Sequence, residues 1–489
     1  MTYDQRHVDE ESPLLTNRNV NVKSRKATPL PKVQILVLLL LQICEPITSQ
    51  SIYPYINQLV SELDITGGDE RKVGYYAGLI ESLFFVTEAL TVLQWSRASD
   101  KIGRKPVLVI GLTGSMISML CFGLSRTFWA LVISRCLTGL LNGNIGVMKS
   151  VMGDLTDQSN RAESFGLLPV VWAFGGTIGP LLGGTFAKPA EKWPQVFTSQ
   201  FWKDYPYFLP CLLPSIYVFF GLLLTIFVFR ESLTWKSRST ISRPSSSSTA
   251  SSLSATPNSD KEDKPLPLRS LFIYPVMISI SNYVALAFLH AAFSALFPLF
   301  MSMPLEIGGL NFPPSTIGYI MGSYGAATGI FQFFFFSKIV RYLGERRVVL
   351  NGIMALPIMF ALCPIMSLVG KNYGINFIIW IAIALITILG ILMDMSFGAV
   401  FMYITASAPN KRSLGATNGL SQTSVSTARA IGPAMSTSLF SLSVQEQWLG
   451  GYAVFALFSC LSILALLIAV RLPAEMWEEE EEEYEGSES

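Results

Sequence analysis

Long apolar segments that can cross a bilayer recur through the chain and decide what it can fold into. They run over 33–56, 74–96, 106–125, 127–149, 163–187 and 207–229, and again over 270–301, 316–340, 347–368, 374–402, 413–443 and 451–471. A spanning helix needs about 20 mostly apolar residues, and 14% of this chain is charged, against about 25% in soluble domains. The sequence therefore predicts an all-α integral membrane protein, with about twelve transmembrane helices in two six-helix bundles.

Basic residues are concentrated in alternate connections between these segments. They gather at 97–105, 149–161, 230–269, 338–347 and 411–412, whereas the other connections carry acids such as Glu62, Asp64 and Glu306. Because Lys and Arg favour the cytoplasmic side, both termini are predicted to be cytoplasmic. The expected layout is a disordered tail over 1–31, bundles over 32–230 and 270–471, a disordered Ser-rich linker over 231–269 and an acidic tail over 472–489.

The connection between the second and third segments, 95–106, is short and strongly charged. It contains the acid Asp100 and the basic residues Arg97, Lys101, Arg104 and Lys105. Gly103 permits a sharp reversal, and Asp100 is spaced to cap a helix end and to pair with Arg104. Taken alone, this pattern predicts a tight cytoplasmic turn.

Ionisable residues inside the apolar segments are costly and indicate the interior of a bundle. Glu45, followed by Pro46, lies midway along the first segment, and Arg135 lies at a comparable depth in the fourth. An acid and a base at one depth are expected to form a protonation-dependent pair. A permanent structural ion pair is the alternative.

Further titratable residues occur in both halves of the chain. Glu81 and Glu88 are seven residues apart and so share one helix face. Asp394 and Arg429 offer an acid and a base in the second half, and His290 is either titratable or a hydrogen-bonding pore residue. Since a carboxyl group in a dry cavity takes up protons readily, we expect these residues to serve proton coupling or to line a substrate cavity.

The fifth segment is unusually rich in glycine. Gly175, Gly179 and Gly183 recur every four residues, and Gly184 follows directly. Such a face lets another helix pack closely. Pro180 removes a backbone donor in the middle of this segment. The density of small residues beside a proline favours a conformational hinge over simple packing.

The two sets of segments show signs of a parallel duplication. Gly179 and Pro180 in the fifth segment recur as Gly432 and Pro433 in the eleventh. The turn at 103–105 has a counterpart at 343–347. Repeats of this kind form the rocking halves of many secondary transporters, with the binding site near the midplane.

Several kinds of chemistry have no pattern in the sequence. The six cysteines lie in apolar segments without a CxxC pair, and there are only two histidines, so no metal site is expected. We find no nucleotide-binding loop and no nucleophile–base set. We therefore expect neither an enzyme nor a nucleic-acid partner, and no cofactor, with energy supplied by a proton gradient.

The N-terminal tail contains a possible sorting signal. Glu10, Leu14 and Leu15 fit an acidic dileucine pattern that sorting adaptors bind. This signal would direct the protein to a vacuolar or endosomal membrane, in competition with default delivery to the plasma membrane.

Three motifs resemble the major facilitator superfamily, and the resemblance covers about 33–471. Residues 96–105 look like the family's loop between spans 2 and 3, 135–139 is similar to its span 4 motif, and 175–184 matches its span 5 antiporter motif. The resemblance implies that Arg135 takes part in proton transfer. It also implies that the cytoplasmic side is gated by Asp100, Gly103, Arg104 and Lys105, and that Asp154 pairs with Arg104 in the outward-open state.

Two positions depart from the family pattern. Ser96 replaces the usual first glycine of the loop, and Arg341 stands where the second-half copy would have an acid. We therefore expect slightly altered packing of spans 2 and 11 and an asymmetric inner gate.

The combined motifs look most like the twelve-span drug:proton antiporters, and among them like fungal members near the zinc-induced facilitator-like group. This resemblance implies a monomeric, proton-coupled antiporter that exports a small organic molecule, such as a drug, toxin or secondary metabolite, as in multidrug resistance. A nutrient or organic-acid facilitator or symporter, and a non-transporting membrane sensor, are the alternatives. The substrate stays open, because a fold does not set pocket specificity.

Overall fold

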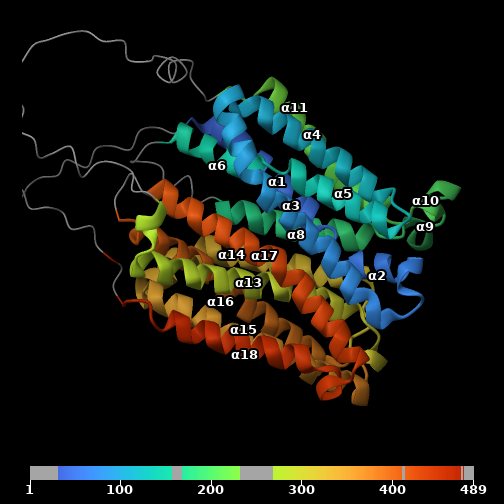
Figure 1. The fold of residues 1–489 in the computed structure, drawn as a ribbon. Helices are drawn as coiled ribbons and strands as arrows, with labels where there is room; N and C mark the ends of the chain where they lie inside the picture. The colour runs from blue at the N-terminus through green and yellow to red at the C-terminus, as the bar shows by residue number, and fades with distance from the viewer. Residues whose placement is uncertain (1–30, 157–167, 232–267, 410–413, 475–476, 478–489) are drawn as a thin grey trace, which may run out of the picture.

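The computed structural model describes residues 31–156, 168–231, 268–409, 414–474 and 477, and these form helices joined by short connections (Figure 1). The first half contains α1 (Lys32–Gln50), α2 (Ile56–Ser61), α3 (Val73–Ile102), α4 (Arg104–Gly123), α5 (Phe128–Leu141), α6 (Asn144–Leu155), α8 (Leu168–Phe186), α9 (Pro189–Lys192), α10 (Gln200–Asp204) and α11 (Phe208–Phe227). The second half contains α13 (Tyr274–Ser302), α14 (Pro314–Leu343), α15 (Glu345–Tyr373), α16 (Phe377–Ala406), α17 (Leu414–Gln445) and α18 (Ala453–Ala469). Short 3-10 turns are η1 (Asp64–Thr66), η2 (Glu70–Lys72), η3 (Leu268–Leu271), η4 (Leu305–Ile307) and η5 (Trp448–Gly451).

These helices supply the twelve crossings that the sequence predicts. In the described part of the chain, 8 spans are long and apolar enough to cross a membrane, and α5 and α6 together form one of them. α8 and α18 contribute shorter apolar helices. α14 and α17, of 30 and 32 residues, complete the set, and both carry many small and polar side chains. The predicted all-α membrane fold is confirmed.

The fourth predicted span, 127–149, is two helices rather than one. α5 ends where Asn142 leaves the helical conformation, at φ −80° and ψ 57°, and α6 begins at Asn144. The Leu140 carbonyl at this break accepts a hydrogen bond from the Trp95 indole at 2.7 Å. Trp95 also packs directly on Gly143. The Asn-Gly pair, typical of turns, thus makes room for a large side chain from α3.

Each half packs its Gly-Pro helix onto its own first helix. In the first half α8 lies on α1, and a Cβ added to Gly179 would come within 3.0 Å of the Ile47 carbonyl. In the second half α17 lies on α13, and a Cβ on Gly432 would lie 3.1 Å from the Phe288 carbonyl. The same close approach, made by corresponding helices, supports the parallel duplication.

Two helix pairs join the halves, α3 with α17 and α8 with α14 (Figure 1). On α3, Gly74 and Gly78 meet Ser441 and Thr437 of α17. These close approaches lie at the start of α3 and near the end of α17, the end of the molecule where α2, α9 and α10 also lie. The predicted topology makes this the outer end. The outer ends of the halves are therefore packed against each other.

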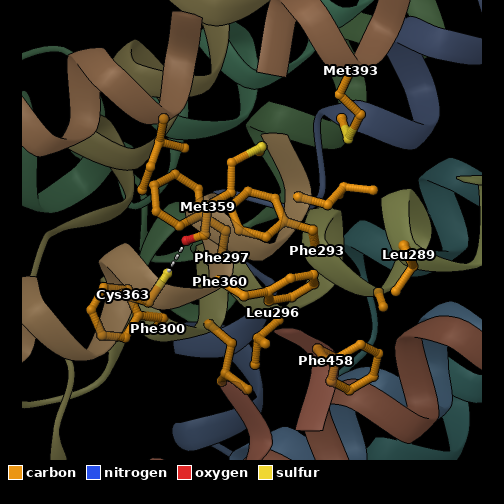
Figure 2. Packing of buried hydrophobic residues seen from close by; sticks show 14 of the residues in the cluster. Leu289, Phe293, Leu296, Phe297, Phe300, Met359, Phe360, Cys363, Met393 and Phe458 are labelled. Atoms are coloured by element: carbon orange, nitrogen blue, oxygen red, sulfur yellow. Dashed lines mark hydrogen bonds between the residues drawn. The ribbon is translucent and has the colours of Figure 1, made fainter. Parts of the chain in front are cut away.

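Buried aromatic side chains fill the second half (Figure 2). Phe293 of α13 stacks on Phe297 and meets Phe360 of α15 edge-on, with ring centres 5.2 Å apart in each case. Phe458 of α18 stacks on Phe360 at 5.3 Å. Because lipid is as apolar as these rings, close packing rather than escape from water holds such helices together. This close packing holds α13, α15 and α18 together as one unit.

Candidate functional site

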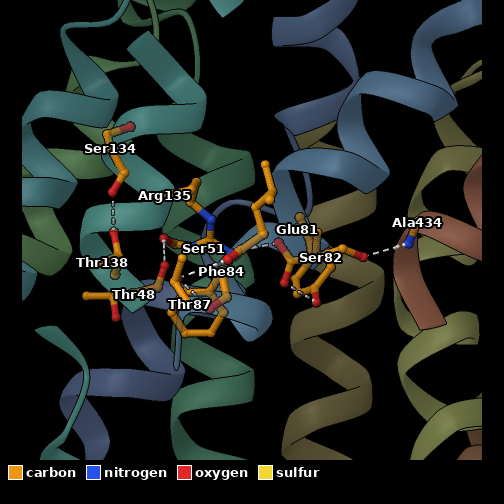
Figure 3. A network of polar contacts seen from close by, with 12 residues as sticks. Thr48, Ser51, Glu81, Ser82, Phe84, Thr87, Ser134, Arg135, Thr138 and Ala434 are labelled. Atoms are coloured by element: carbon orange, nitrogen blue, oxygen red, sulfur yellow. Dashed lines mark hydrogen bonds and ion pairs between the residues drawn. The ribbon is translucent and has the colours of Figure 1, made fainter. Parts of the chain in front are cut away.

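A buried ion pair lies at the centre of the first half (Figure 3). Arg135 of α5 donates from Nη2 to Oε2 of Glu81 on α3 at 2.7 Å, and the two side chains are 2% and 8% exposed. The Tyr53 hydroxyl donates to the other carboxylate oxygen at 2.7 Å. The guanidinium carbon also lies 4.7 Å from the centre of the Phe84 ring. Because both charges are shielded from water, separating them would be costly.

This pairing differs from the one expected from depth alone. The sequence places Glu45 beside Arg135, whereas the structure gives Arg135 the carboxylate of Glu81. The reason is that α5 packs directly against α3. Glu45 is half-buried on α1, in a helix that continues through Pro46, where the Thr48 hydroxyl donates to the Cys44 and Glu45 carbonyls at 2.9 Å.

The expected shared face of Glu81 and Glu88 is present. Asn142, seven residues after Arg135, donates from Nδ2 to Oε1 of Glu88 at 3.0 Å. Two polar contacts, two helical turns apart, therefore join α3 to the fourth span. The outer contact, Glu81 with Arg135, is the buried ion pair, and the inner contact, Glu88 with Asn142, lies at the break between α5 and α6.

The first-half ion pair is next to a contact between the halves. Ser82, which follows Glu81 on α3, accepts a hydrogen bond from the Ala434 amide of α17 at 2.8 Å (Figure 3). Ala434 comes directly after Pro433. A shift of α3 that accompanies any change at Glu81 would therefore act on the Gly-Pro helix of the second half.

A second polar cluster brings together three helices of the second half. His290 of α13 lies with Nε2 3.7 Å from Oδ1 of Asp394 on α16. The Tyr324 hydroxyl of α14 donates to the other oxygen of Asp394. The His290 and Asp394 side chains are 31% and 16% exposed, so solvent reaches this cluster more readily than it reaches the first-half ion pair. The Phe397 ring meets the imidazole edge-on at 5.3 Å.

Arg429 does not form the expected ion pair with Asp394. It is half-buried on α17, and among the described residues it has neither an ion pair nor a hydrogen bond. Arg429 therefore presents a half-buried cation on the helix that packs against both α13 and α3.

The charged turn between α3 and α4 is held by a residue from the end of the same half. Glu231 accepts hydrogen bonds from the backbone amides of Arg104 at 2.9 Å and Lys105 at 3.0 Å, and so caps the start of α4. Gly103 has φ +107°, and a Cβ there would lie 2.6 Å from the Glu231 carboxylate. The positive φ therefore favours glycine at this position, and the missing side chain also leaves room for the capping carboxylate.

The basic side chains of this turn also have partners. The Arg104 guanidinium donates to the Ser99 hydroxyl at 2.6 Å. The Lys105 ammonium donates to the carbonyls of Ile226 and Phe229 at 2.8 Å and 3.0 Å, at the end of α11. The side chains of Asp100 and Asp154 lie outside the described residues, so their pairing with Arg104 stays a prediction.

The glycines of α8 separate into two packing faces. Gly175, Gly179 and Gly183 lie against α1, and a Cβ on Gly175 would come within 2.5 Å of the Pro46 ring. Gly184 faces the other half, where a Cβ would lie 2.9 Å from the Gly318 Cα of α14. Pro180 lies inside the helix between these contacts. The expected close-packing face is confirmed, and α8 is packed against both its own half and the partner half.

The sequence analysis missed three site residues, and two of them have no signal in the sequence that marks them. Tyr53 and Tyr324 are two of 17 tyrosines, and nothing in their spacing connects them to Glu81 or Asp394. Glu231 follows the sixth span directly. An acid just past an inner helix end, near a basic turn, is the one cue that could have identified it.

These features define a class of protein. Two packed bundles with a repeated architecture, buried ionisable clusters at mid-depth and glycine-lined contacts between halves are those of a secondary transporter. Residues 38–310 and 299–487 match the Major Facilitator Superfamily, and the chain belongs to this family. It is a transporter rather than an enzyme.

Similar proteins include several from fungi and from a plant. The chain is 34% identical to the major facilitator-type transporter psiT2 of Psilocybe cyanescens, over 87% of each chain. It is 28% identical to the multidrug transporter mfsB of Aspergillus fumigatus, over 94% of this chain and 85% of that one, and 27% identical to zinc induced facilitator-like 1 of Arabidopsis thaliana, over 88% of each. The fold resembles a bacterial homologue of the lysosomal transporter Spinster, described as inward-facing and unoccupied, with a TM-score of 0.60 at 15% identity, over 90% of this chain and 94% of that one.

Proposed function

We propose that this protein is a proton-coupled antiporter that exports a small organic molecule by alternating access. The Asp394 cluster is the single observation on which the proposal rests, because a carboxylate, an imidazole and a phenol meet there at a partly accessible site. Similar proteins described as a multidrug transporter and as an efflux pump support the direction of transport.

In this mechanism Asp394 carries the proton, because its side chain is partly exposed and lies beside His290 and Tyr324. With the outer side open, Asp394 takes up a proton and loses the negative charge that faces His290 and Tyr324. With the inner side open, the proton leaves, and the carboxylate again accepts from Tyr324 and faces the imidazole. Binding of a cationic substrate near Asp394 favours proton release, so that the two occupants exclude each other.

The first-half ion pair has a different role. Arg135 and Glu81 are paired with each other and almost completely buried. They hold α3 to α5, and Ser82 transmits their position to α17. Glu45 stays a second candidate for the coupling proton, because it is a half-buried acid on the helix that α8 packs against.

Proton flux in reconstituted vesicles tests this proposal. Vesicles with an interior pH dye receive a panel of organic cations, neutral drugs and organic acids. We expect at least one compound to drive proton movement, Asp394→Asn to abolish the coupling, and Glu81→Gln to reduce the rate without removing it. Loss of coupling in Glu45→Gln but not in Asp394→Asn would show that Glu45, rather than Asp394, carries the coupling proton. Compound flux without proton flux would contradict antiport.

We also propose a monomer located in the plasma membrane. The family establishes a multi-pass membrane protein, and the tail motif of Glu10, Leu14 and Leu15 lies outside the described residues. Replacing both leucines by alanine should leave a fluorescent fusion at the cell surface. Movement from an internal membrane to the surface would instead show that sorting adaptors recognise this motif.

A further inference from the structure

A cavity of about 410 Å³ lies at the outer end, where the two halves meet. It is separate from the clusters around Arg135 and Asp394. Its lining comes from the segment around α2 and from the connection between α13 and α14. Asn57, Gln58 and Glu62, with Glu70 of η2, line it from the first half, and Asn311 and Phe312 line it from the second. The volume is within the range of small-molecule pockets.

Two side chains of the cavity wall have polar atoms without a partner. Asn57 is 3% exposed, and its Nδ2 has no acceptor among the described residues. Oε1 of the neighbouring Gln58 likewise has no donor there. Most buried polar groups have hydrogen-bond partners. The two amides therefore offer a donor and an acceptor to a molecule in the cavity, since rotation of either terminal amide can direct either atom toward it.

The cavity favours a positively charged ligand. Among its described lining residues two are carboxylates, Glu62 and Glu70, and none is basic. Lys188 at 2.7 Å and the Tyr207 hydroxyl at 2.9 Å already bind Glu62. Glu70 is exposed at the mouth. The Phe312 ring provides an apolar surface. An organic ammonium ion with a hydroxyl or amide group matches this set.

The wall that the second half contributes is well fixed. The Leu310 amide donates to the Phe300 carbonyl at 3.2 Å, the Asn311 amide to Met303 at 2.8 Å and the Phe312 amide to Met301 at 2.8 Å. These bonds tie the connection to the end of α13, so it moves with the second half. The opposite wall belongs to the first half. Opening of the outer side must therefore pull the cavity apart.

We propose that this cavity is a second small-molecule site, which binds an organic ammonium ion from the outer side and holds the outer gate closed. A ligand seated against both halves stabilises the closed state by its difference in affinity for the two states. An exported amine that accumulates outside would then slow its own transport. The binding part of this inference does not depend on proton coupling.

Binding of tyramine to the full-length protein in lipid nanodiscs tests the site. Its ammonium group would face the carboxylates, and its phenol can both donate and accept. We expect saturable binding that weakens about tenfold in Asn57→Ala, in Gln58→Ala and in Glu70→Gln, and no binding of 3-(4-hydroxyphenyl)propionate, its carboxylate counterpart. Glu70→Gln replaces an exposed residue, so it remains informative if the buried substitutions impair folding.

A control variant separates this site from the central one. In an Asp394→Asn background, Glu70→Gln should still weaken tyramine binding about tenfold, because the outer cavity is separate from the central cluster. Binding that is lost in Asp394→Asn but kept in Glu70→Gln would place tyramine in the central cavity and overturn the proposal. Absence of saturable binding in the wild type would overturn it as well.

The gating effect needs a distance measurement. Spin labels at Asp64 and Glu306, which are exposed on opposite halves at the outer end, report whether that end is closed. Tyramine should shift the distribution toward the short distance, and Glu70→Gln should reduce the shift. A shift toward the long distance would contradict the proposed closure.

Discussion

The ion pair between Arg135 and Glu81 shows how a single buried charge affects the stability of this protein. Both side chains are almost completely buried, and each is stabilised mainly by the other. Removing one charge leaves the other uncompensated in a medium of low polarity, which typically costs about 3–5 kcal/mol. Replacing both by neutral groups avoids this penalty.

We expect Glu81→Gln to lower the unfolding free energy by about 3 kcal/mol and the double variant Glu81→Gln, Arg135→Gln to recover much of the loss. Thermal unfolding of the purified protein, followed by intrinsic fluorescence, measures both. If the double variant were less stable than either single variant, the pair would not be the stabilising unit. The measured difference also separates stability from the transport effect of Glu81→Gln.

Asp69→Asn is the matched control at an exposed pair. Asp69 accepts hydrogen bonds from Arg71 at the start of η2. The side-chain bond from Arg71 holds the pKa of Asp69 below its usual value. The contribution of this pair is therefore fully present at neutral pH and is lost only as pH falls through the lowered pKa. Because exposed pairs are worth little, the variant should unfold almost as the wild type does at pH 7.

At the scale of helices, the sequence predicts spans better than partners. Apolar length locates the crossings, because each must match the bilayer. It does not reveal the break at Asn142, which depends on Trp95 from another helix. It also cannot choose between Glu45 and Glu81 as the partner of Arg135, because both are acids at suitable depth and only helix packing decides. The glycine face of α8 was predictable, because glycines repeated every four residues lie on one helix face and let another helix pack closely.

Gly184 provides a test of the contact between α8 and α14. A Cβ on Gly184 would lie 2.9 Å from the Gly318 Cα, and backbone atoms cannot move aside. Overpacking typically costs about 1–3 kcal/mol. We expect Gly184→Ala to shift the population toward the outward-open state by about tenfold, seen as faster labelling of a single cysteine in the outer part of the interface.

The same helix contains the control for this experiment. A Cβ on Gly176 would have nothing within 4 Å, so Gly176→Ala should leave both labelling and transport close to wild type. Equal effects of the two substitutions would mean that helix propensity, rather than contact between the halves, explains the result.

At the scale of the whole molecule, the structure is two packed halves that meet along α3 with α17 and α8 with α14, including at their outer ends. The inner turn is held within its own half by Glu231, whereas the outer contacts of α3 with α17 and α8 with α14 cross between the halves. Alternating access then requires the outer contacts to separate while the halves keep their internal packing. A bond across the halves should stop the cycle, and a similar bond within one half should not.

The cysteine pair Gly78→Cys, Thr437→Cys tests this in a background without the native cysteines. A Cβ on Gly78 of α3 would lie 3.1 Å from the Cβ of Thr437 on α17, so a separation of a few tenths of an ångström brings the pair into the range of about 3.5–4.5 Å found in disulfides. The control pair is Gly352→Cys, Ser396→Cys, where the corresponding distance between α15 and α16 is 3.0 Å within the second half. Oxidation should abolish transport in the first pair, and reduction should restore it, because the outer ends can no longer part. The control pair should transport at the same rate in its oxidised and reduced states, and that ratio rather than its absolute rate is the control, because a Cβ on Gly352 also lies 2.6 Å from the Leu392 carbonyl. Undiminished transport by a fully cross-linked first pair would rule out separation of α3 from α17 as a step of the cycle.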